Sequence, residues 1–144
     1  MSAVRDILVR KGPTLISVRP ADTVLRAATL MNDEGIGGVL VMEGDDLAGI
    51  FTERDVLRRV VAAGLDPARA TVGEVLTSSV VTCEPQTSIV ECATLMTARH
   101  IRHLPVREAG RLVGLVTIGD LLAFQVSEQQ TTIEQMNNYL FDLR

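Results

Sequence analysis

The chain is poor in several residue types, and each shortage restricts the possible composition of its core or the class of ligand that it can bind. Its 144 residues include no tryptophan, one lysine among 14 basic residues, and only 3% aromatic residues. The core must therefore be built from Val, Leu, Ile, Ala and Met. The formal charge is -4 with no basic block, which disfavours binding to nucleic acid through phosphates. The arginines are better suited to one small anion, because the guanidinium fork matches a phosphate.

Cysteine is scarce and long apolar runs are missing. Cys83 and Cys92 are the only cysteines, and their spacing fits neither a zinc signature nor a disulfide framework. We predict that both are small core residues in a reducing cytoplasm. Residues 1–11 lack the apolar segment of a secretory leader, and no run is long enough to cross a bilayer. The predicted localisation is cytoplasmic, without a membrane.

An internal repeat is the strongest signal in the sequence. An offset of 65 residues aligns 20–57 with 85–122 without a gap, and 13 of the aligned pairs are identical. Chance would give about two or three. The repeat predicts an α+β fold of two β-α-β-β-α copies related by a pseudo-twofold axis. Each copy alone is too small to bury a good core, so the pair should fold as one unit.

The expected elements follow the repeat. Each copy is predicted to begin with a helical turn, at 4–8 and 72–76, and a first strand, at 15–18 and 80–83. A helix should follow, from Asp22 or Thr23 to about 34 and from Thr87 to about 99. Each copy should end with a hairpin, at 39–51 and 103–116, and a helix after Thr52 or Thr117. The predicted domains are 1–65 and 66–126, followed by a C-terminal amphipathic helix in 127–144.

The C-terminal segment has no counterpart in the repeat. Residues 131–134 fit a capping box, and an apolar stripe of Ile133, Met136, Leu140 and Leu143 follows. This stripe either closes over its own chain or packs on a second subunit.

Two matched stretches, 49–55 and 114–120, share the pattern Gly, two apolar residues, Thr, two variable residues, Asp. Thr52 and Thr117 can cap a helix, and Asp55 and Asp120 fall in its first turn, where the helix dipole favours a negative charge. For one copy, capping alone is the favoured interpretation. A site for an anion or a sugar at the helix N-terminus is the alternative.

The two copies differ where the second strand begins. Gly37 and Gly38 in the first copy align with Arg102 and His103 in the second. Glycines permit close backbone approach to a ligand, and the cationic pair can bind a phosphate. A solvated strand edge explains Arg102 and His103 equally well.

Catalytic patterns are lacking. His100 and His103 form an H-x-x-H pair without a third ligand, which is a weak metal signal. No nucleophile motif or Walker loop occurs. We therefore predict no catalytic residues, no metal and no enzymatic activity.

The motifs in 49–57, 101–106 and 114–122, together with the repeat, resemble a tandem pair of CBS (cystathionine-β-synthase) domains over roughly residues 1–126. The resemblance implies two clefts that bind adenosine compounds: AMP, ADP, ATP, NAD or S-adenosylmethionine. It places Asp55 and Asp120 on the ribose, and Thr52 and Thr117 on ribose or phosphate. The implied contacts to the base are Ile16, Ile36, Val81 and Ile101, and those to phosphate are Arg102, His103 and Arg54. Gly37 and Gly38 depart from the cationic pattern, so the two sites should differ.

The resemblance implies a homodimeric regulatory module for energy sensing that needs no cofactor and signals to an unknown protein. Three rivals stay open. The chain could be a structural dimerisation module with vestigial clefts, a small nucleotide hydrolase, metal-assisted or not, or, least favoured, a DNA-binding protein.

Overall fold

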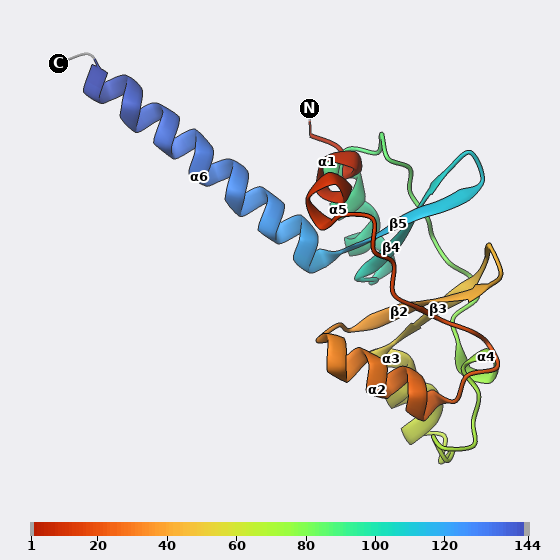
Figure 1. Ribbon diagram of the computed structural model, residues 1–144. Coiled ribbons are helices and arrows are strands. Elements are labelled where there is room, and N and C mark those ends of the chain that lie inside the picture. Colours follow the sequence, from red (N-terminus) through yellow and green to blue (C-terminus); the bar gives the residue numbers. More distant parts are fainter. Residues whose placement is uncertain (1, 143–144) are drawn as a thin grey trace.

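The computed structural model describes residues 2–142, and side-chain burial is described for 2–140. Two similar halves are stacked, and one long helix projects from the second half (Figure 1). The first half contains β1 (Ser17–Val18), α2 (Val24–Glu34), β2 (Gly38–Glu43), β3 (Asp46–Thr52), α3 (Glu53–Asp55) and the π-helical segment η1 (Val56–Val61). The second half contains α5 (Ile89–Arg99), β4 (His103–Glu108), β5 (Arg111–Thr117) and α6 (Ile118–Asp142). Two short helices, α1 (Val4–Lys11) and α4 (Val72–Val75), precede the halves in sequence.

The two hairpins have the same register, as the repeat predicts. Gly38 pairs with Thr52 in β2 and β3, and His103 pairs with Thr117 in β4 and β5. Each hairpin has a bulge at the matched position, after Val41 and after Val106. The α+β fold of two related units with a C-terminal helix is therefore confirmed.

The first strands differ between the halves. β1 pairs in parallel with β2, whereas the predicted strand at 80–83 is wrong, because only an isolated bridge joins Cys83 to Val106. Leu40 donates its N–H to the carbonyl of Ile16, at 3.4 Å. The residue matched to Leu40 is Pro105, which has no N–H to donate. The second half therefore lacks the hydrogen bond that would hold Val81 in a strand.

Helix ends follow local chemistry. The Thr23 hydroxyl caps α2 by accepting the N–H of Arg26. Ser88, rather than the predicted Thr87, caps α5 by accepting the N–H of Glu91. The Thr87 hydroxyl instead accepts the N–H of Glu84 in the preceding turn. These caps satisfy N–H groups that the first helical turn leaves free.

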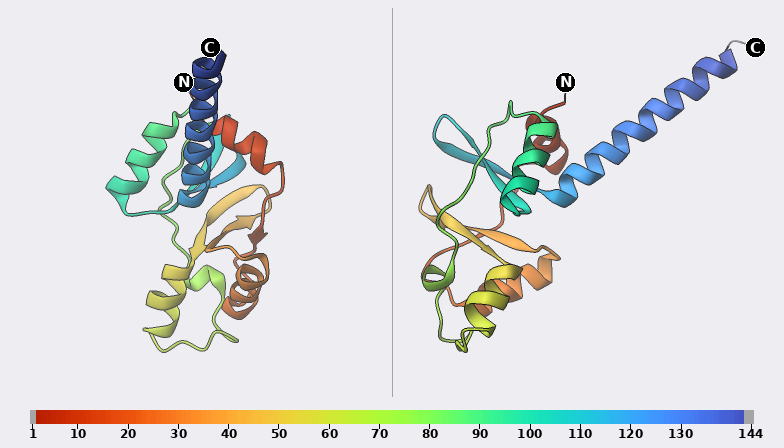
Figure 2. Two further views of the ribbon diagram at one scale, coloured as in Figure 1. Left: turned by 90° about the vertical axis from the view of Figure 1, so that its left-hand side faces the viewer. Right: turned by 180° about the vertical axis from the view of Figure 1, so that it is seen from behind.

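The two short helices exchange halves: α1 packs in the core of the second half, and α4 packs in the core of the first half. Val4 and Ile7 of α1 pack with Cys92, Leu104 and other residues of the second half. Val72 and Val75 of α4 pack in the core of the first half. The hydrophobic cores therefore cross the linear boundary expected near residue 65, and both views in Figure 2 show α1 beside the second half.

The C-terminal region is one helix, not two. α6 runs unbroken from Ile118 to Asp142, so the predicted helix start at 131–134 is wrong. The Thr131 and Thr132 hydroxyls donate to the carbonyls of Ser127 and Glu128, four residues back, which is helix-interior geometry. Leu143 lies outside the described residues. Across 2–142, none of the helices combines the length and the apolar character needed to span a bilayer.

Candidate functional site

A cavity of about 880 Å³ lies between the two halves, within the usual size range of small-molecule sites. Its walls come from the β1 region, the starts of β2 and β4, the strand-to-helix turns after β3 and β5, and the end of α1. Apolar side chains supply much of the surface: Leu15, Ile16, Ile36, Ile50, Leu57, Ile101, Leu115 and Ile118.

Gly38 and His103 bring the two halves together at this cavity. A Cβ placed on Gly38 would lie 2.9 Å from His103 Nε2 and 3.1 Å from Thr52 Cγ2. Such contacts are shorter than packed side chains allow, so the imidazole occupies the space that glycine leaves open. The two matched residues thus have complementary shapes: Gly38 leaves space, and the His103 side chain fills it.

In the first half, the Asp55 carboxylate is held by the fold itself. Its Oδ2 accepts the N–H of Thr52 at 3.0 Å, and its Oδ1 accepts the Thr77 hydroxyl at 3.0 Å. Arg59 Nε lies 3.5 Å from Oδ1. Asp55 is buried but still lines the cavity. It therefore has the capping role that the sequence favours. The Thr52 hydroxyl also donates to Oδ2, at 3.4 Å, so three of the roughly four acceptor sites of the carboxylate are used and one further donor can be accepted.

In the second half, Asp120 has a different partner. Its Oδ2 accepts the N–H of Thr117 at 2.9 Å and pairs with Lys11 Nζ at 2.8 Å. The Thr117 hydroxyl accepts the N–H of Asp120 at 3.2 Å. Lys11 also donates to the carbonyl of Leu115, at 2.7 Å. The ammonium of Lys11 thus covers the Asp120 carboxylate, which does not line the cavity.

The cavity is more positive than the acidic chain around it. Four cationic residues line it, together with two carboxylates: Lys11, Arg54, Arg58, Arg102, Glu53 and Asp55. Arg54 spans the halves by donating from Nη1 to the carbonyl of His100, at 2.9 Å. A cluster of positive charge in a low-dielectric cleft attracts a small anion.

His103 adds a donor without a full charge. Burial lowers the pKa of its imidazole below the usual 6.5, Glu53 opposes that shift, and Lys11 and Arg102 reinforce it. At neutral pH the ring is therefore uncharged, and one of its nitrogens donates while the other accepts.

The structure brings most of the predicted site residues to this single cavity. Eleven of the thirteen line it: Ile16, Ile36, Gly37, Gly38, Thr52, Arg54, Asp55, Ile101, Arg102, His103 and Thr117. Val81 and Asp120 do not. Val81 packs against the second core, and Asp120 is paired with Lys11.

Several lining residues were not predicted from the sequence. Lys11, Thr77 and Arg58 all line the cavity. The only signal for Lys11 is that it is the sole lysine of the chain. Thr77 follows α4, and its position opposite Ile50 in an isolated bridge depends on tertiary packing that no local pattern reveals.

The cysteines form part of the second core. Cys83 and Cys92 are buried free thiols, as predicted. A hydrogen bond with Cys92 and burial both raise the pKa of the Cys83 thiol, so it stays protonated and unreactive. Within residues 2–142, no group of three or more His, Cys, Asp or Glu side chains is arranged to hold a metal ion.

Comparison with known proteins gives consistent matches. The family model described as "CBS domain" matches residues 4–62 and 72–127. The chain is 35% identical over 129 residues to the CBS domain-containing protein YhcV of Bacillus subtilis, which covers 90% of this chain and 89% of that protein. It is 36% identical to hypoxic response protein 1 of Mycobacterium tuberculosis, over 84% of this chain and 83% of that protein. A solved structure of a protein with CBS domains from Burkholderia ambifaria superposes with a TM-score of 0.85 at 42% identity, covering 89% of this chain and 96% of that one.

Proposed function

Because the chain belongs to the CBS domain family as a tandem pair, we propose that its central cavity binds an adenosine nucleotide and that the protein is a non-catalytic regulatory module. The observation that carries this proposal is the cavity itself. It combines isoleucine walls suited to a flat base with a cationic rim suited to phosphate. AMP, ADP, ATP and NAD all have this combination of groups.

The base would lie between Ile16 and Ile36 on one side and Ile101 on the other. The phosphates would lie toward Arg102, with Arg54 and His103 as further donors. The ribose hydroxyls would donate to Asp55, which lines the cavity. A ribose at Asp120 would first have to displace Lys11 from the carboxylate, so we propose that the two halves bind unequally.

Regulation would follow from the position of the cavity. A ligand there contacts both halves and so favours one relative arrangement of them. Arg54 already joins the halves through the His100 carbonyl, and a phosphate would compete for its guanidinium. The changed arrangement would be read by a partner protein. We further propose that the module acts in energy sensing as a cytoplasmic homodimer.

Calorimetric titration of an Arg102→Met variant tests this proposal. Arg102 is exposed and lines the cavity, so neutralising it should leave the fold intact. We expect ATP affinity to fall about tenfold, the effect of losing one charged hydrogen bond, with adenosine affinity unchanged. Asp55→Asn should weaken ATP and adenosine alike, because ribose is common to both.

Arg111→Met is the matched control, because Arg111 is exposed on β5 and does not line the cavity. Equal loss of ATP and adenosine binding in Arg102→Met would contradict the phosphate assignment. A wild-type protein that binds none of the four nucleotides would refute the proposal and favour a structural dimerisation module. Turnover of a bound nucleotide would instead favour an enzyme.

A further inference from the structure

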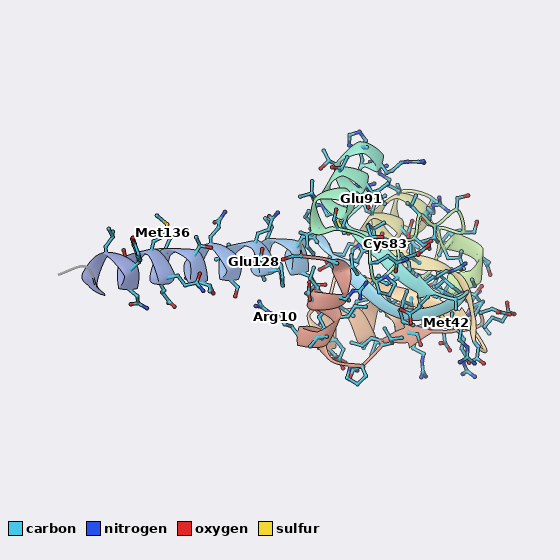
Figure 3. All side chains as sticks on the ribbon, turned by 90° about the horizontal axis from the view of Figure 1, so that it is seen from above. Arg10, Met42, Cys83, Glu91, Glu128 and Met136 are labelled. Carbon is cyan, nitrogen blue, oxygen red and sulfur yellow. The ribbon has the colours of Figure 1, made fainter. Side chains whose placement is uncertain are left out.

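The outer part of α6 is an exposed helix with no covering element. Phe124 is the last buried side chain among the described residues of α6, and every residue from 128 to 140 is exposed. Figure 3 shows this part, from Glu128 past Met136, extending away from the body. The family match ends at residue 127. An isolated helix of this length is only marginally stable in water, so a partner should cover its apolar side.

The apolar side has the spacing of a coiled coil. Leu122, Val126, Ile133, Met136 and Leu140 are exposed by 53–60%. With Gln129 they follow one another at alternating intervals of four and three residues. Such a 3.5-residue period places all six on one seam that can interlock with an equally spaced partner helix. We call these six residues the α6 seam.

The charge of α6 argues against other occupants. Residues 118–142 contain no lysine or arginine and four acidic residues: Asp120, Glu128, Glu134 and Asp142. Anionic lipid and nucleic acid would repel this helix. The body of the same chain is out of reach, because α6 is straight and points away from it (Figure 2). A second copy of the chain supplies an identical seam by symmetry.

We propose that two copies of this chain pair through their α6 seams as a parallel two-stranded coiled coil between Leu122 and Leu140. The proposal gives the proposed homodimer a definite interface and does not depend on nucleotide binding. Gln129 favours the parallel orientation. In a parallel pair the two Gln129 amides face each other and can hydrogen-bond, whereas in an antiparallel pair centred on the seam each amide faces Ile133.

The seam is short, so contacts between the bodies should add to it. Leu57 and Val61, on the η1 segment that follows Thr52, are also exposed apolar residues. Leu57 aligns with Leu122 in the repeat. A parallel coil holds both bodies at the same end, where such surfaces can meet.

Sedimentation measurements over a range of protein concentrations test the interface with two lysine variants. Ile133→Lys places a charge in the seam, and Thr131→Lys places the same charge on the opposite face of the helix. We expect Ile133→Lys to raise the dimer dissociation constant about tenfold or more and Thr131→Lys to leave it unchanged. Both residues lie beyond the body, and circular dichroism with melting temperature checks that the body stays folded.

Oxidative cross-linking of single-cysteine substitutions tests the orientation. The native cysteines are buried, so an added oxidant joins only engineered thiols, taking up two protons and two electrons per disulfide. Met136→Cys should form a covalent dimer and Thr131→Cys should not. A cross-link found only when Val126→Cys and Met136→Cys proteins are mixed would overturn the parallel arrangement.

Other outcomes separate this proposal from those on function. A dimer that Ile133→Lys does not weaken would overturn the α6 interface while leaving the homodimer intact. A monomeric wild-type protein would overturn both the interface and the homodimer, but not nucleotide binding, which is titrated separately. Co-sedimentation of the wild type with phosphatidylglycerol vesicles, lost in Ile133→Lys alone, would also overturn the proposal by assigning the seam to lipid.

Discussion

At the scale of single residues, His103 links the cavity to the stability of the fold. Its ring lies against Gly38, and its backbone pairs with Thr117 across the hairpin. Burial lowers its pKa, Lys11 and Arg102 lower it further, and Glu53 and Asp120 act in the opposite direction. Folding therefore favours the neutral form of this histidine.

The sign of the resulting pH dependence follows from linkage. In the unfolded chain His103 has a pKa of about 6.5, so on acidification it takes up a proton before the folded protein does. Its contribution to stability is complete above about pH 6.5 and declines as the pH falls toward the folded pKa. We expect the melting temperature of His103→Gln to fall less steeply than that of wild type between about pH 7.5 and pH 5.5.

His100→Gln is the control for this measurement, because His100 is exposed at the end of α5. His100 does not line the cavity, so this variant shows the effect of losing an imidazole elsewhere in the protein. The prediction fails if His103→Gln and wild type lose melting temperature in parallel as the pH falls.

At the scale of elements, the two hairpin turns differ at a position where the backbone is left-handed. Gly44 in the first turn has φ 63°, and the matched residue of the second turn, Ala109, has φ 53°. Glycine adopts this left-handed region freely, whereas alanine is strained there. The residue at this position is therefore less favourable in the second turn than in the first.

Exchanging these residues should change stability in opposite directions. We expect Ala109→Gly to increase the free energy of unfolding by about 1 kcal/mol and Gly44→Ala to decrease it by about the same amount. Space is not the issue, because a Cβ at Gly44 would meet nothing within 4 Å. Urea denaturation checks both values, and a destabilised Ala109→Gly protein would show that the turn relieves the strain in another way.

At the scale of the whole molecule, the exchanged short helices make the halves interdependent. The N–H of Val4 donates to the Thr87 carbonyl, and the N–H of Val72 donates to the Asp22 carbonyl, at 2.9 and 2.8 Å. Both valines are fully buried, each in the core of the half to which these carbonyls belong. The second half cannot complete its core from one continuous stretch of chain, and the first half needs α4, which lies beyond the boundary expected near residue 65.

We therefore expect a single unfolding transition that responds to changes in either half. Val4→Ala and Val72→Ala should each lower the free energy of unfolding by roughly 2 kcal/mol and move the same calorimetric transition. Val9→Ala on α1 is the control, because Val9 is 81% exposed and should have little effect. Two resolved transitions, with Val4→Ala shifting only one, would show that the halves fold independently.

The repeat predicted much of this architecture and part of the site. An offset of 65 residues anticipated that the two hairpins share one register. It also identified Gly38 and His103 as matched positions, which the structure brings against each other. These features depend on local patterns that both copies carry, so they are readable from the chain alone.

What the sequence could not reveal depends on contacts between distant segments. Lys11 reaches Asp120, more than 100 residues away, and α1 and α4 each pack in the other half from the one expected. The prediction of a helix start within α6 was wrong for a local reason. A threonine hydroxyl can cap a helix or donate to a carbonyl four residues back. The residues around Thr131 fit both roles, so the sequence does not distinguish them.

The exchange of α1 also has a consequence for how the protein is made. A ribosome synthesises α1 before its packing partners in the second core, which extend to Phe124. The apolar face of α1, with Val4 and Ile7, therefore stays uncovered until nearly the whole chain has emerged. The first half, by contrast, has all its core residues once α4 is out. α1 is thus made early but can join the second core only after the residues that form that core have been synthesised.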